Sequence, residues 1–112
     1  MLNIRENIVF FSVASSWEIA IKFGLGKLEL PQPQKEYIPR CLIDQEMSSL
    51  PIHHNHTLQA GDLPPHHRDP FDRLLIAQAQ IEKLPIMTAD QDFKAYDVEV
   101  IWAKKQNAAS GY

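Results

Sequence analysis

The strongest constraint on the fold comes from residues 71–84, FDRLLIAQAQIEKL, which have the pattern of the clearest helix in the chain. Apolar side chains occur on nearly all sides of this helix, and a helix of that kind is buried. Because the helix is buried, we expect its N-terminus to direct an acid into a cleft instead of into solvent. The apolar residues are Leu74, Leu75, Ile76, Ala77, Ala79 and Ile81.

Apolar segments of strand length alternate with helical segments along the rest of the chain. Residues 7–14, NIVFFSVA, are β-branched and aromatic without alternation, which is the pattern of a buried strand. Further strand candidates are SSLPI, LPIMTAD and VEVIW. Helix candidates are SSWEIAIKFGLG, residues 35–47 (which Pro39 restricts to a first turn), residues 54–60 and DFKAY. Strands separated by helices predict an α/β domain with a mostly parallel sheet covered on both faces.

Composition and charge exclude some classes of protein. The chain has 112 residues, the size of one domain, with 45% hydrophobic and 22% charged residues, which are ordinary values for a soluble globular domain. Its formal net charge of -3 argues against a strongly basic nucleic-acid binder that relies on phosphate neutralisation. The charge leaves room for an enzyme that reaches phosphates through a bound metal ion.

The sequence indicates neither a membrane span nor a signal peptide. The longest continuous apolar run, residues 8–11, is far below the roughly 20 residues of a membrane span. Arg5 precedes this run as in a signal peptide, but Glu6 cancels its charge and an amphipathic helix pattern follows. Cys41 is the only cysteine, so an internal disulfide is impossible, and the cytoplasm is the expected compartment.

Glu18 has both a structural and a functional interpretation. Ser15 and Glu18 fit the S-x-x-E capping box, in which the Glu18 carboxylate accepts from the backbone N–H of Ser15. Glu18 and Lys22 also have the i, i+4 spacing that favours a helical ion pair. However, ligands of such α/β sheets bind at the carboxyl ends of the strands, and Glu18 lies just inside a helix that follows a strand.

Asp69 and Asp72 have two interpretations as well. Asp69 can be the N-cap of the buried helix, with Pro70 at its first position and Asp72 near the positive end of the helix dipole. This structural interpretation accounts for both acids but not for the burial of the helix behind them. Acids at the start of a buried helix are also candidates for binding a metal ion in a cleft.

Asp90 and Asp92 follow a strand candidate. Local hydrogen bonds favour Asp at the end of a strand, so turn formation explains Asp90, and Asp92 can cap the turn DFKAY. The carboxyl end of a parallel strand is also where a ligand binds, which makes Asp90 a candidate for a functional site.

Several histidines raise the alternative of a zinc site. The run HHNH at residues 53–56 has a spacing that matches no strong zinc pattern, and no cysteine lies nearby in the sequence. His66 and His67 lie in a polar loop beside Arg68. Exposure to solvent explains these two histidines, and a contact with RNA phosphate is the alternative.

Three segments, SSWEIAIKFGLGKLELP, LPPHHRDPFDRLLIAQAQIEKLPIMTAD and DFKAYDVEVIW, carry motifs whose order is informative. Together they strongly resemble the PIN-domain ribonucleases, in particular the VapC-type toxins of bacterial toxin–antitoxin pairs. The resemblance extends over about residues 7–102. It implies a three-layer α/β/α domain with a mostly parallel sheet, which we place at residues 1–103, and residues 104–112 read as a C-terminal tail.

The resemblance also implies an activity, a metal ion and partners. Family members are metal-dependent endoribonucleases that cluster four acids around Mg²⁺ or Mn²⁺. They form homodimers and are silenced by an antitoxin peptide that lies across the active site. By position, Glu18, Asp72 and Asp90 match the catalytic and metal-binding acids, and Asp92 and Asp69 are weaker candidates.

The chemistry of RNA hydrolysis suits these residue types. Mg²⁺ takes oxygen ligands and keeps several waters, so a few carboxylates suffice to bind it. The ion can orient a water for in-line attack and neutralise charge on the phosphate, which explains how a net negative chain can cut RNA. Arg68, Arg73, Lys22 and Lys27 are candidate contacts with the RNA backbone, although all four are common residue types on solvated faces.

One family element is missing from the chain on this interpretation. The resemblance implies a first strand that carries an Asp at the centre of the sheet, whereas LNIREN matches the end of the helix that follows such a strand. We therefore expect an N-terminally truncated domain, through a start assigned too late or a truncated gene. The vacant central position would expose backbone groups and apolar surface.

Two hypotheses remain beside a Mg²⁺-dependent ribonuclease. The chain can be a catalytically inactive truncated remnant that only binds an antitoxin or a second copy of itself. It can also be an unrelated small α/β phosphate-binding domain, in which the acids only cap helices and Mg²⁺ does not bind.

Overall fold

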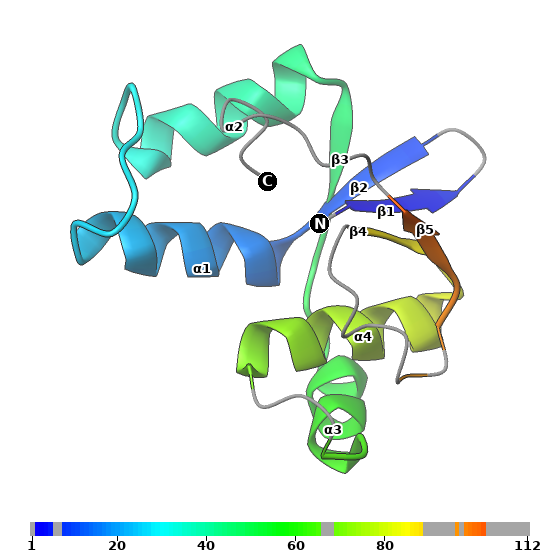
Figure 1. Cartoon of the computed structure of the whole chain (residues 1–112). Helices are drawn as coiled ribbons and strands as arrows, with labels where there is room; N and C mark the ends of the chain where they lie inside the picture. Colours follow the sequence, from blue (N-terminus) through cyan, green and yellow to red (C-terminus); the bar gives the residue numbers. More distant parts are fainter. Residues whose placement is uncertain (1, 6–7, 66–68, 89–95, 97, 103–112) are drawn as a thin grey trace.

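The chain folds as an α/β domain. The computed structural model describes residues 2–5, 8–65, 69–88, 96 and 98–102. The elements are β1 (Leu2–Arg5), β2 (Ile8–Ser12), α1 (Val13–Gly24), α2 (Gln34–Asp44), β3 (Met47–Leu50), α3 (His54–Asp62), α4 (Pro70–Glu82), β4 (Ile86–Thr88) and β5 (Val100–Trp102). After a first pair of strands, two pairs of helices flank β3, and β4 and β5 follow the second pair (Figure 1).

The five strands of the described residues form one sheet in the order β3-β2-β1-β4-β5. β2 pairs with β3, and β4 pairs with β5, in parallel, while β1 pairs with β2 and β4 antiparallel. The strands other than β1 therefore share one direction, which confirms the prediction of a mostly parallel sheet. The helices α1 and α2 pack on each other, as do α3 and α4, and the two pairs lie on different sides of the strands (Figure 1). The result is the expected three-layer α/β/α arrangement.

The strand β1 occupies the central position of the sheet, so two expectations about the N-terminal segment are wrong. Residues 2–5 form a strand and not the end of a helix, and they fill the position that we expected to be vacant. Asn3 is opposite Phe10 on one side and Ile86 on the other. The physical reason is that β2 and β4 each present a row of backbone N–H and C=O groups, and pairing with β1 satisfies both rows.

The structure differs from the sequence prediction at the start of α1 and within α2. The strand β2 ends at Ser12, and α1 already begins at Val13 because Ser12 caps it. The helix α2 continues through Pro39, which we expected to restrict it to a first turn. Proline removes the helical hydrogen bond to the carbonyl four residues earlier, but Lys35 and Pro39 are both exposed. Water can therefore satisfy that carbonyl, and the helix tolerates the loss.

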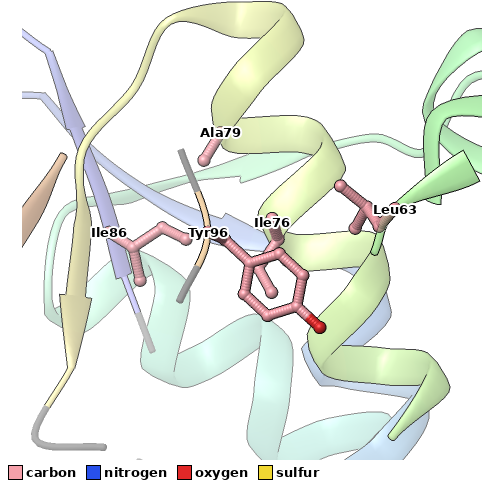
Figure 2. Close-up of a cluster of buried hydrophobic side chains, with 5 residues drawn as sticks. All are labelled: Leu63, Ile76, Ala79, Ile86 and Tyr96. Carbon is pink, nitrogen blue, oxygen red and sulfur yellow. The ribbon is translucent and has the colours of Figure 1, made fainter. Parts of the chain in front are cut away.

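The core of the described residues lies between α4 and the strands. Leu75, Ile76 and Ala77 of α4 are each at most 1% exposed, which confirms the prediction that this helix is buried. It packs beside β4 and the end of α3. The apolar cluster in Figure 2 consists of Leu63, Ile76, Ala79, Ile86 and Tyr96.

Two of the expected segments fall wholly or largely outside the described residues. The turn DFKAY lies largely outside the described residues, and so does the tail at residues 104–112. In the described part of the chain, no helix combines the length and the apolar character needed to cross a membrane.

Candidate active site at the carboxyl edge of the sheet

The N-terminus of α4 has the capping structure that its sequence predicts. Asp69 is the N-cap, and its carboxylate oxygen Oδ1 accepts from the backbone N–H of Phe71 at 2.9 Å and of Asp72 at 3.4 Å. Pro70 occupies the first helical position, where its missing N–H costs nothing. Asp72 is therefore held in the first turn, near the positive end of the helix dipole. Asp72 is a half-buried residue.

The capping-box interpretation of Glu18 is wrong. The N-cap of α1 is Ser12, whose Oγ accepts from the backbone N–H of Ala14 at 3.0 Å. Ser15 is a buried residue within the helix, so it cannot be the N-cap that the box requires. The expected ion pair is confirmed, because Glu18 Oε2 lies 3.2 Å from Lys22 Nζ. Glu18 is thus a largely covered carboxylate on the second turn of a helix that leaves the carboxyl end of β2.

A buried hydrogen bond links the start of α1 to the middle of α4. Ser12 Oγ donates to Gln78 Oε1 at 2.5 Å, and Gln78 Nε2 donates to the backbone carbonyl of Pro51 at 3.0 Å. Ser12 ends β2 and Pro51 directly follows β3, so Gln78 contacts the carboxyl ends of two neighbouring parallel strands. Neither Ser12 nor Gln78 was predicted from the sequence as a functional residue. The available signal was the pair of long amides, Gln78 and Gln80, within an otherwise apolar helical stretch.

The two helices that carry Glu18 and Asp72 are in contact, since α1 packs against α4. Both acids offer carboxylate oxygens, the ligands that Mg²⁺ and Mn²⁺ prefer, so the donor chemistry fits a hard divalent cation. Asp90 and Asp92 lie outside the described residues. Within the described residues, no group of three or more His, Cys, Asp or Glu side chains is arranged to hold a metal ion. β1, at the centre of the sheet, has the sequence LNIR and carries no acid.

Two of the candidate RNA-binding cations have partners inside the protein. Arg73 donates through its guanidinium to the carbonyls of Ala60 at 2.8 Å, Leu63 at 2.9 Å and Pro64 at 3.1 Å. These bonds join the C-terminal end of α3 to the first turn of α4. Lys22 is the ion-pair partner of Glu18, while Arg68 lies outside the described residues.

Of the described histidines, His56 joins α3 to α4, whereas His53 and His54 are exposed. His56 is fully buried. Its Nδ1 accepts from the backbone N–H of His53 at 2.9 Å, and its Nε2 lies 2.8 Å from Glu82 Oε2. Because the backbone donor occupies Nδ1, the ring proton is on Nε2 and is donated to Glu82. Both nitrogens of His56 are therefore engaged within the protein, which explains this histidine without a zinc ion.

Comparison with known proteins agrees with this architecture. The family profile described as PIN domain matches residues 2–99. Because the match covers most of the chain, the chain belongs to the PIN-domain family. A curated relative, ribonuclease VapC16 of Mycobacterium tuberculosis, is 43% identical over 52 residues, which are 46% of this chain and 37% of the relative. The chain thus aligns with little more than a third of that relative's length. No solved structure gives a significant match.

Proposed function

We propose that this chain is a metal-dependent endoribonuclease of the VapC type, which hydrolyses RNA phosphodiester bonds as the toxin of a toxin–antitoxin pair in the cytoplasm. The observation that carries the proposal is the placement of Glu18 and Asp72 on α1 and α4, two helices that pack together in a PIN-family domain. The similarity to a protein named ribonuclease VapC16 supports the reaction class.

In this proposal Glu18 and Asp72 bind Mg²⁺ or Mn²⁺ together with Asp90, with Asp92 as the weaker extra ligand. When bound, the ion supplies positive charge for the phosphate and lowers the pKa of a coordinated water. Asp69 caps α4 and so holds the turn that carries Asp72. Lys22 stays close to Glu18 and offsets part of the repulsion between neighbouring carboxylates.

The surface between α1 and α2 has features of a protein-binding surface. A shallow groove of about 360 Å³ is lined by Val13, Trp17, Ala20, Ile38 and Pro39 among others. Trp17 is 60% exposed, although a tryptophan carries a large apolar surface that proteins usually bury. We therefore assign this face to protein association, with the antitoxin and a second copy of the chain as the expected partners.

One observation favours a second candidate function. The resemblance implies an acid on the central strand, and β1 occupies that position without one. A carboxylate set that lacks this member binds a divalent cation more weakly, because ligand number and charge determine affinity. The alternative is therefore a catalytically inactive module that still binds an antitoxin or a second copy of itself.

RNA cleavage by the purified chain distinguishes the two functions. The reaction is run with Mg²⁺ or Mn²⁺, with EDTA, and with the variant Asp72→Asn. The matched control is Asp44→Asn, which removes the same charge from an exposed position at the end of α2. The proposal expects cleavage that EDTA and Asp72→Asn abolish and that Asp44→Asn leaves intact. A folded chain that does not cleave RNA would favour the inactive module, and cleavage by Asp72→Asn would exclude Asp72 from the site.

A further inference from the structure

The hydrogen bond between Ser12 and Gln78 is a buried polar contact between residues 66 positions apart in the sequence. Both residues are 0% exposed. Burying an amide and a hydroxyl is unfavourable unless their hydrogen bonds are made, and the neighbours of Gln78 on α4 are the apolar residues Ala77 and Ala79. An apolar side chain at this position would leave the buried Ser12 hydroxyl without its acceptor. The glutamine therefore indicates that the contact between α4 and the strand ends must have a defined orientation. A hydrogen bond depends on orientation, whereas an apolar contact does not.

The geometry fixes the orientation of the Gln78 amide. The carbonyl of Pro51 can only accept, so the group at 3.0 Å from it is the amide nitrogen of Gln78. The amide oxygen then faces Ser12 at 2.5 Å, and Ser12 is the donor. The Ser12 oxygen in turn accepts from the backbone N–H of Ala14. A reversed amide would place its oxygen against the Pro51 carbonyl oxygen and lose that bond, so one orientation of the Gln78 amide satisfies both partners.

The two residues of the Ser12–Gln78 contact are each six positions in the sequence from one of the candidate acids. Glu18 is six residues after Ser12 on α1, and Asp72 is six residues before Gln78 on α4. Six residues of α-helix span roughly 9 Å along its axis. In Figure 1, α1 and α4 run in roughly opposite directions, and in the sequence Glu18 follows the contact whereas Asp72 precedes it.

We propose that Gln78 is a positioning residue of the active site. By bonding Ser12 and Pro51, it determines how α4 lies against α1, and so it sets the separation of the Glu18 and Asp72 carboxylates. The role in metal binding rests on the proposed function, whereas the role in helix placement does not. Arg73 holds the other end of the same helix segment through its bonds to the end of α3.

A distance measurement on the full-length chain tests the helix placement. Spin labels are attached to Gly24→Cys and Pro70→Cys, with Cys41→Ser to remove the only native thiol. Gly24 ends α1 with no atom within 4 Å of an added Cβ, and Pro70 begins α4 and is exposed. The test variant is Gln78→Met, which keeps the length of the side chain without its hydrogen bonds. The matched control is Gln59→Met, which removes the 2.6 Å hydrogen bond from Gln59 of α3 to Gln80 of α4.

The proposal expects the α1–α4 distance distribution to shift or broaden in Gln78→Met and to stay unchanged in Gln59→Met. Both variants are first checked for cooperative unfolding. If Gln78→Met does not fold, Gln78→Asn replaces it, because the shorter amide cannot reach both partners. An unchanged distribution in the folded Gln78 variant would overturn the proposal.

Mn²⁺ affinity of the same proteins, without spin labels, tests the link to the acids. Removing an outer contact that orients metal ligands typically weakens binding about 10- to 100-fold, so we expect Gln78→Met to lose at least about tenfold in affinity while Gln59→Met matches the parent chain. A shifted distance with unchanged Mn²⁺ affinity would refute the positioning role. A parent chain that binds no Mn²⁺ would refute the proposed metal site itself, and the distance measurement would still decide the helix placement.

Discussion

His56 Nε2 lies 2.8 Å from Glu82 Oε2, which joins the first turn of α3 to the last residue of α4. The imidazole is fully buried, whereas the Glu82 side chain is 34% exposed. The pair therefore gives a buried donor its acceptor at the rim of the core. This contact is one of the structural features that the histidine-rich sequence concealed.

Replacing Glu82 tests the contact with His56. We expect Glu82→Met to lower the free energy of unfolding by about 1–3 kcal/mol, because it leaves the buried Nε2–H of His56 without an acceptor. Glu82→Gln keeps an acceptor oxygen and should cost less. Urea unfolding followed by circular dichroism measures both variants, with Glu36→Gln on the exposed face of α2 as the control. Equal midpoints for Glu82→Met and the parent chain would contradict the assignment.

Arg73 is expected to stabilise the junction of α3 and α4. Arg73→Met keeps the apolar stem but removes the donors to three carbonyls, so we expect a loss of about 1–3 kcal/mol in unfolding free energy. Arg73→Lys should be intermediate, because an ammonium lacks the planar fork of a guanidinium. Thermal unfolding measures the stability and RNA binding is measured in parallel. A normal melting temperature with weakened RNA binding would restore Arg73 as an RNA contact.

We expect Asp69 and Asp72 to have different roles, Asp69 as the cap of α4 and Asp72 as a metal ligand. Asp69→Ala removes the acceptor for the first N–H groups of α4, and loss of such a cap costs about 1 kcal/mol. Asp69→Asn should retain most of the stability, since asparagine is an equally good N-cap. Asp72→Asn should change stability little but abolish Mn²⁺ binding. Unfolding and Mn²⁺ titration of the three variants provide the comparison, and equal Mn²⁺ binding by Asp72→Asn and the parent chain would exclude Asp72 as a ligand.

The central position of β1 predicts a strong effect of proline. Asn3 has partners on both sides, so its backbone N–H faces a neighbouring strand whichever way it points. Proline lacks this N–H and is confined to edge strands and bulges. We expect Asn3→Pro to prevent stable folding, whereas Asn3→Ala retains the N–H and should melt close to the parent chain. Similar melting curves for the two variants would show that β1 does not hold the sheet together.

The chain's own pattern predicted α4 in detail, including its cap, its proline at the first position and its burial. These signals act over a few residues: Asp69 bonds to N–H groups two and three positions ahead, and apolar residues on all sides require a covered helix. The ion pair of Glu18 with Lys22 could be predicted for the same reason, since one helical turn brings them together. The parallel strands followed from the alternation of strand and helix segments.

Contacts between distant segments settled the features that the pattern missed. By local rules, either Ser12 or Ser15 could cap α1. Only Ser12 lies at the end of β2, where its hydroxyl can donate a hydrogen bond to Gln78. Likewise, the four residues of β1 are too few to specify a conformation by themselves. They form a strand because they pair with the backbone N–H and C=O groups of β2 and β4. Local sequence therefore determined where α4 starts and that it is buried, because a few neighbouring residues satisfy those conditions. The cap of α1 and the centre of the sheet depended on partners that only folding brings together.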